Sequence, residues 1–234
     1  MKYAAALAGL VIICLFLVGE VTIPGVVSTR LERAIAASVD GIESVHVHVR
    51  TFPALALAAG KIHSLRLDAR NMVVDGLRVR RLFIDARNAE VDVSSVLGGG
   101  KLVVRRVGRS DVTVVLAEDD LNSYFHSRDG ILRFLTVRLR RDFATVSGSA
   151  SVLGAKVEFA LEGRFVVSGD TRLAYVVDRV TVGRTVVPDV IKDGLLRSVD
   201  LSVDVSGLPV PVALKDVNVQ DGVAYIFGSA CSGE

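Results

Sequence analysis

The chain of 234 residues has no Trp, two Cys and two Met, and aromatic residues make up only 6% of it. It contains no G-x-S-x-G, H-E-x-x-H, P-loop or C-x-x-C motif. Cys14 lies inside an apolar run and Cys231 lies near the C-terminus, so we expect no disulfide between them. A net charge of +2 is too small to predict a nucleic acid partner. These absences favour a protein that is not an enzyme and that carries no cofactor and no metal.

The N-terminus carries a single Lys at position 2, followed by uncharged apolar residues from Ala4 to Val18. Such a run is typical of a secretory signal peptide or a short membrane anchor. No good cleavage site follows, since Leu17 stands where a small residue would be needed. We therefore predict that residues 1–19 are a signal anchor, with a cleaved signal peptide as the alternative. Either role places residues 20–234 outside the cytoplasm, held at the membrane or, after cleavage, secreted.

Beyond this segment, Val and Leu recur at every second position in many short stretches. In the stretch from Ser198 to Val205, one face is Val and Leu and the other is Ser and Asp. This alternation predicts half-buried antiparallel strands. A change of parity at Arg80 and Arg81 predicts a bulge or a bend. Final strands are predicted at Val199–Val205, Val212–Val219 and Val223–Phe227.

Three short helices are predicted among the strands. The first runs from Val26 to Val39 with apolar residues four apart, a second opens at Glu118, and a third starts at Pro188. The two main blocks of strands are similar in size, but their residues show no repeat, and no linker divides them. We therefore predict one continuous α+β domain over residues 20–234.

Two polar features could form sites. His46 and His48 share one face of a predicted strand, and a metal site would need further ligands, for which His63 and Glu43 are candidates. Their position opposite the apolar face favours plain exposure to solvent. Arginines cluster at positions 78–81, 105–109 and 138–141, where they can pair with acids on neighbouring strands or contact an anionic head group.

Three short helices cannot cover so much apolar strand surface, which leaves two alternatives. The sheets pack on one another as a dry sandwich, or part of the inner face lines a cavity for acyl chains. Each buried methylene would contribute about 0.8 kcal/mol to binding such a chain. The candidate lining residues follow the apolar parity of the first helix and of the long strands. They are Leu31, Ile35, Leu65, Leu67, Val157, Phe159, Leu161, Leu173, Tyr175 and Val177.

Several stretches, in this order and spacing, resemble the LmeA-like phospholipid-binding family. They begin with the segment from Val47 to Leu55, which runs on to Gly60-Lys61-Ile62. The others are Asp68-Ala69-Arg70-Asn71, Asp75-Gly76-Leu77, Glu118 to Tyr124, Val152-Leu153-Gly154, Val187-Pro188, Leu208-Pro209-Val210 and Val217 to Gly222. The likeness covers nearly all of the chain beyond the N-terminal apolar run.

The resemblance implies a long curved antiparallel sheet wrapped around an amphipathic helix, like that of tubular lipid-binding folds. It also implies an exported protein of the bacterial cell envelope that binds phospholipid without chemical turnover. The expected partners are therefore phospholipid and the membrane, with transport of lipid left open and protein partners unknown. The alternatives are a structural or partner-binding envelope module with a dry core, or a metal-dependent hydrolase that uses His46 and His48.

Overall fold

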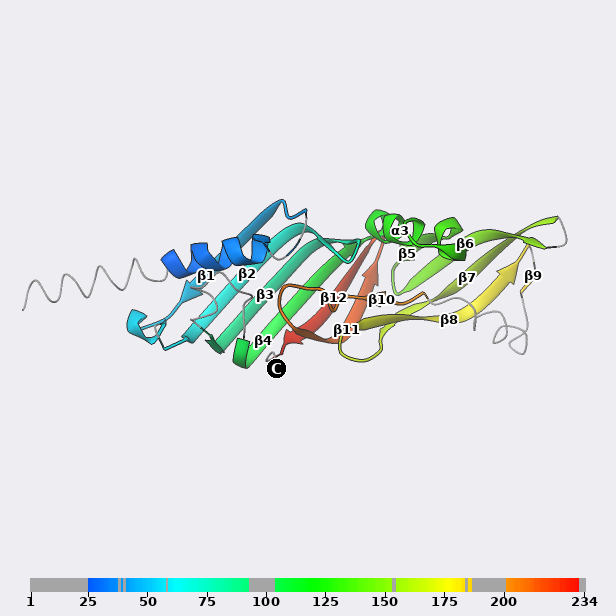
Figure 1. Cartoon of the computed structure of the whole chain (residues 1–234). Coiled ribbons are helices and arrows are strands. Elements are labelled where there is room, and N and C mark those ends of the chain that lie inside the picture. Colours follow the sequence, from blue (N-terminus) through cyan, green and yellow to red (C-terminus); the bar gives the residue numbers. More distant parts are fainter. Residues whose placement is uncertain are drawn as a thin grey trace, which may run out of the picture.

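The computed structural model describes residues 25–37, 39, 41–57, 59–92, 104–152, 155–183, 185–186 and 201–231. The predicted N-terminal anchor and the predicted helix after Pro188 lie outside these residues. The described chain forms two antiparallel sheets that lie side by side along an elongated molecule (Figure 1). The sheets are not stacked face to face, so the sandwich, one of the two alternatives, is not the architecture observed. The predicted α+β fold with a long curved sheet is confirmed.

The first sheet begins with the N-terminal helix, a name we use for residues 25–37. This helix agrees closely with the predicted Val26–Val39 helix. It lies over β1 and β2 at one end of the molecule (Figure 1). The elements that follow it are β1 (Ser44–Arg50), the 3-10 helix η1 (Ala54–Leu57), β2 (Lys61–Val74), β3 (Leu77–Val91) and β4 (Val104–Ala117).

The second sheet repeats this arrangement. Helix α3 (Glu118–His126) starts directly after β4, at the predicted position, with three acidic residues in its first turn. The elements after it are η2 (Gly130–Phe134), β5 (Thr136–Arg140), β6 (Phe143–Val152), β7 (Ala155–Val167), β8 (Arg172–Val182) and β9 (Thr185–Val186). Each half is therefore a helix followed by a meander of four long strands, a repeat of structure that the residues do not reveal.

The last part of the chain returns to the first sheet. Residues 201–211, which we call the crossover segment, contain β10 (Val203–Asp204) and lead into the hairpin of β11 (Val212–Gln220) and β12 (Val223–Ala230). The first sheet has the order β1-β2-β3-β4-β12-β11, and the second has the order β10-β8-β7-β6-β5 with β9 beside β8. Strand β11 contacts β5, β6 and β7, and so joins the two sheets.

The predicted irregularity at Arg80 and Arg81 is present as a change of parity, without a bulge in the pairing with β2. Both side chains are exposed, and the buried positions of β3 change parity there, from Val79 to Leu82. The pairing of β2 with β3 keeps its register across this point. The register holds because β2 changes parity opposite, at Asn71, which adopts a left-handed backbone with φ of 52°. The paired change keeps the apolar faces of both strands toward the core.

The predicted strand at Val199–Val205 is confirmed in part over its described residues, 201–205. Only Val203 and Asp204 pair with a neighbouring strand, β8. The alternation extends beyond this pair, since Leu201, Val203 and Val205 are buried while Asp204 is exposed. The crossover segment lies on the core with one side inward, and the Val205 N–H continues the pairing with β8 by donating to the Thr171 carbonyl oxygen. The two following strands are confirmed, each slightly longer than predicted.

Candidate apolar binding site

A narrow cavity lies where the N-terminal helix, the crossover segment and the inner face of the first sheet meet. The helix supplies Leu31 and Ile35, and the crossover segment supplies Val210. Aliphatic side chains form the whole lining. The remaining lining residues are Val47, Leu65, Leu67, Ile84, Ala86, Ala89, Val91, Val104, Val107 and Ala230. Such a surface offers apolar area and no directional polar group, which suits a hydrocarbon chain.

The cavity is small in this conformation, at about 20 Å³. That volume has room for roughly one or two water molecules. The N-terminal helix fills most of the space above the strands, because Leu31 and Ile35 are 1% and 3% exposed. An acyl chain can therefore enter only where the helix or the crossover segment moves away from the sheet.

Two polar contacts hold the N-terminal helix to the sheet. The backbone N–H of Val47 donates to Glu32 Oε1 at 2.8 Å, and the N–H of Val49 donates to Ser28 Oγ at 3.2 Å. Among the described strands β1 is an edge strand, paired only with β2, so these N–H groups face away from the sheet and need another acceptor. Ser28 and Glu32 lie one turn apart on the same face of the helix. We call this pair of contacts the edge clamp.

Helix α3 makes the same kind of clamp on β5, the edge strand of the second sheet. The N–H of Leu139 donates to Glu118 Oε2 at 2.7 Å, and the N–H of Val137 donates to Asn122 Oδ1 at 2.7 Å. In both clamps the bonded residues are 21 and 15 positions apart. The clamps share geometry but not residue types, since Ser and Glu in the first correspond to Glu and Asn in the second. This is why the repeat is not visible in the sequence.

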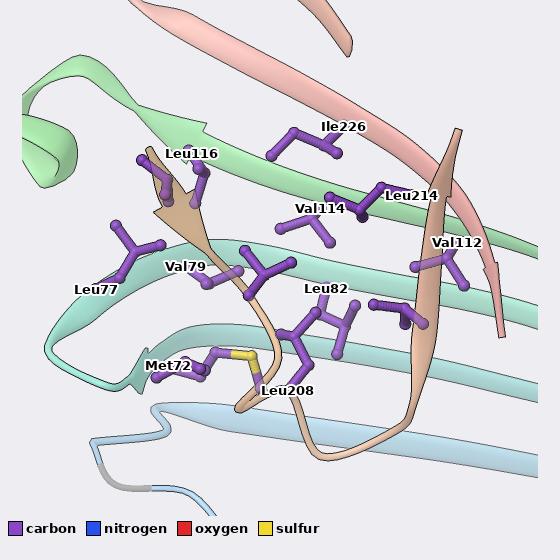
Figure 2. Packing of buried hydrophobic residues seen from close by; sticks show 14 of the residues in the cluster. Met72, Leu77, Val79, Leu82, Val112, Val114, Leu116, Leu208, Leu214 and Ile226 are labelled. Carbon is purple, nitrogen blue, oxygen red and sulfur yellow. The ribbon is translucent and has the colours of Figure 1, made fainter. Parts of the chain in front are cut away.

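Further along the inner face of the first sheet, the crossover segment closes the surface. Leu208 lies beside Met72 and Leu82 in Figure 2, and these three side chains are buried. The Val205 N–H donates to the Thr171 carbonyl oxygen at 2.9 Å, and so ties the segment to the second sheet. The face is thus covered by two separate elements, with the cavity at their junction.

The structure brings together four of the predicted lining residues. Leu31, Ile35, Leu65 and Leu67 line this one cavity. The sequence analysis missed Val210 and the small residues Ala86 and Ala89. Val210 belongs to one of the motifs that carry the family resemblance, and this motif could have indicated it. The two alanines lie at buried positions of β3, so the alternation of that strand could have indicated them. That any of these residues contacts lipid stays a prediction.

The other six predicted residues lie on the second sheet, on β7 and β8. Leu161 and Leu173 are buried. Val157, Phe159, Tyr175 and Val177 are half-buried. The Tyr175 hydroxyl lies 2.8 Å from the carbonyl oxygen of Ala144 and 2.9 Å from that of Leu161. Burial raises the pKa of Tyr175 above its ordinary value. These six residues therefore form a separate apolar face, away from the cavity under the N-terminal helix.

Three of the clustered arginines form ion pairs with acidic side chains. Arg80 Nε lies 2.6 Å from Asp120 Oδ2, and so links β3 to α3. Arg81 pairs with Asp68 at 2.8 Å, and its hydrogen bond holds the pKa of that carboxyl below its usual value. Arg105 pairs with Asp92 at 2.7 Å. These three arginines therefore pair with acids, which is one of the two roles predicted for the clusters.

The two strand histidines are exposed on the outer side of β1, as predicted. His48 Nε2 accepts a hydrogen bond from Arg50 Nε at 2.9 Å. Across the described residues, no three His, Cys, Asp or Glu side chains come together as a metal site would require. None of the helices in the described part of the chain has the length and apolar character needed to span a membrane.

Comparison with known proteins agrees with the character of the cavity. Searches of curated proteins and of solved structures gave no match. The model of the LmeA-like phospholipid-binding family matches residues 18–223, which is most of the chain and includes the N-terminal helix, the crossover segment and every described strand except β12. The chain therefore belongs to the LmeA-like phospholipid-binding family.

Proposed function

We propose that this protein holds a phospholipid by its acyl chains between the N-terminal helix and the inner face of the first sheet. The observation that carries the proposal is the cavity, whose lining is aliphatic on every side. Membership of a phospholipid-binding family supports it. The protein acts by binding alone, as a single domain over residues 20–234, and does not change the lipid chemically.

The N-terminal helix is the lid of this site. Opening exposes Leu31 and Ile35 together with the strand residues beneath them, and an acyl chain replaces the helix against the sheet. Burial of about 25 cal/mol per Å² of apolar surface drives the exchange. The edge clamp opposes opening, because the N–H groups of Val47 and Val49 lose their acceptors when the helix leaves.

The site works outside the cytoplasm. The uncharged run from Ala4 to Val18 holds the protein at the outer face of the bacterial membrane, so that the site lies close to a source of phospholipid. A lid that opens near a membrane suits transfer of lipid as well as storage.

Lipid retention by the full chain tests the binding site. The protein is purified in a detergent that contains no phosphorus, and the phospholipid that remains is extracted, counted by phosphate and identified by mass spectrometry. We expect phospholipid in stoichiometric amount. Replacing Ala89 with Leu fills the cavity with apolar volume and should lower the retained lipid several-fold.

Ala224→Leu is the matched control. Ala224 is 2% exposed and Ala89 is 3% exposed, but Ala224 does not line the cavity. Either substitution overpacks the core, at a cost of about 1–3 kcal/mol, so only the cavity distinguishes the two variants. A wild-type protein that retains no phospholipid and takes none from labelled vesicles would overturn the proposal and favour a dry structural or partner-binding module.

A further inference from the structure

One end of the molecule carries an apolar surface that the fold does not explain. Phe52, in the connection between β1 and β2, is 73% exposed and is the most exposed large hydrophobic side chain among the described residues. The sequence from Phe52 to Ala59, FPALALAA, has no polar side chain. Surface connections are normally polar. Leu57 is buried in the core, but Phe52, Pro53 and Ala59 are exposed, so this end of the connection presents apolar side chains to its surroundings.

The start of the N-terminal helix lies at the same end. The edge clamp pairs Ser28 with Val49 and Glu32 with Val47, so the helix runs antiparallel to β1. The first turn of the helix therefore lies beside the end of β1 and the connection that follows it, as Figure 1 also shows. Val26, in this turn, is 59% exposed. Phe52 and Val26 thus project from one end, which we call the Phe52 tip.

Cationic side chains border the Phe52 tip. Arg50 precedes the apolar connection and Lys61 follows it, and both are exposed. Thr51, the residue after Arg50, holds the two ends of the connection together, since its hydroxyl donates to the Lys61 carbonyl oxygen at 3.3 Å. On the neighbouring strands, Lys61 lies opposite Glu90, and Glu90 lies opposite the exposed Arg106. Glu90 and Asp92 are the acids here, and Asp92 is paired with Arg105, so positive charge predominates.

The short length of chain before the helix indicates that the partner of the Phe52 tip is a membrane. The described part of the helix begins at residue 25, and the apolar run ends at Val18, so six residues lie between them. Such a link spans at most about 25 Å. A membrane that holds the run from Ala4 to Val18 therefore keeps the Phe52 tip within reach of its surface. The cavity residues Val91 and Val104 are at the ends of their strands toward this tip.

We propose that the Phe52 tip docks on an anionic phospholipid membrane, with Phe52 inserted among the acyl chains and Arg50, Lys61 and Arg106 at the head groups. An aromatic ring next to basic side chains suits the boundary between head groups and hydrocarbon. Docking brings the end of the cavity that Val91 and Val104 line toward the lipid. The inference rests on the proposed function for its purpose, but the contact itself does not require an occupied cavity.

The absence of Trp from the chain makes a direct test possible. Full-length Phe52→Trp carries a sole tryptophan and is reconstituted in vesicles that contain anionic phospholipid with brominated acyl chains. We expect emission at shorter wavelength and strong quenching. Phe143→Trp is the control, since Phe143 is also exposed, at 43%, but lies on the second sheet and should not be quenched. Equal quenching of the two variants would overturn the proposal.

Charge is tested in the Phe52→Trp background. Replacing Arg50, Lys61 and Arg106 with Gln should shift the ratio of docked to undocked protein by up to about 100-fold on anionic vesicles, at about fivefold for each residue. The matched triple variant replaces Arg138, Arg140 and Arg141, which are also exposed, and should change little. An equal effect of both triple variants would contradict a specific docking surface.

The two proposals can fail separately. Adding Ala89→Leu to Phe52→Trp removes the lipid in the cavity but should leave quenching intact, because Phe52 does not line the cavity. Quenching in the Phe52→Trp single variant, with an intact cavity but no retained lipid, would leave docking in place and overturn the binding site. Quenching lost together with cavity lipid would show that a bound lipid, and not the membrane, is the quencher, and would overturn docking.

Discussion

The edge clamp should control how often the N-terminal helix leaves the sheet, and Glu32→Ala tests this directly. The substitution removes the acceptor of the Val47 N–H, a contact of 2.8 Å to a charged group. Ala has the highest helix propensity, so the helix itself is not weakened. A hydrogen bond to a charged group contributes about 1.5–3 kcal/mol. Because Glu32 is only half-buried, we take the lower figure, which makes opening about tenfold more frequent.

Hydrogen exchange of single amides measures this opening. The Val47 amide should exchange faster in Glu32→Ala for the trivial reason that its acceptor is gone. The Val49 amide is the informative one, because its own acceptor, Ser28 Oγ, remains. If the helix moves as a body, exchange at Val49 also rises by about tenfold, and uptake of fluorescent phospholipid from vesicles becomes faster.

Glu118→Ala is the matched control, since it removes the equivalent acceptor from the Leu139 N–H in the second sheet. It should raise exchange at Leu139 and leave Val49 and the rate of lipid uptake unchanged. Faster exchange at Val47 alone, with Val49 and lipid uptake as in the wild type, would refute the reasoning. The helix would then be a fixed part of the core and not a lid.

Three further predictions follow from the contacts described above. Leu208→Ala removes a buried side chain of the crossover segment and should lower the free energy of unfolding by about 2–5 kcal/mol, measured by urea denaturation; a loss below about 1 kcal/mol would show that the segment packs loosely. Because the Arg81 hydrogen bond lowers the pKa of Asp68 below 3.8, the folded state gains stability from this carboxylate above that pH and loses it as pH falls toward the lowered pKa. Asp68→Asn should therefore flatten the dependence of stability on pH below about 3.8, and an unchanged acid titration of unfolding would contradict the pairing. N-terminal sequencing of protein from the membrane fraction should return the uncleaved chain, whereas a mature form that starts near Glu20 and is found in the medium would show a cleaved signal peptide.

Much of the fold could be predicted from the sequence because apolar periodicity sets it directly. The N-terminal helix, α3 and the final hairpin follow from residues that repeat every three to four positions or every second position. The irregularity at Arg80 and Arg81 also follows from the sequence, because the alternation of apolar residues changes parity there. These features depend on neighbours in the chain, so a single sequence carries them.

The features that sequence analysis missed depend on contacts across the chain. The crossover segment shows strand-like alternation, because one side is buried, yet only Val203 and Asp204 pair with another strand. The edge clamps use different side chains for the same contact, so no residue pattern marks the repeat. The alternation of apolar residues cannot separate the lining of the cavity from ordinary core. The predicted lining therefore includes residues of both sheets, such as Leu67 and Leu161.

Photo-crosslinking tests the central claim most directly. The full-length protein is incubated with vesicles that contain a phospholipid with a diazirine near the end of one acyl chain, illuminated, digested and analysed by mass spectrometry. The account predicts adducts on the N-terminal helix and on the β2 and β3 peptides that carry Leu67, Ile84 and Ala86, and their loss in Ala89→Leu. Adducts confined to the Phe52 connection, or found only on β7 and β8, would contradict a phospholipid held between the N-terminal helix and the first sheet.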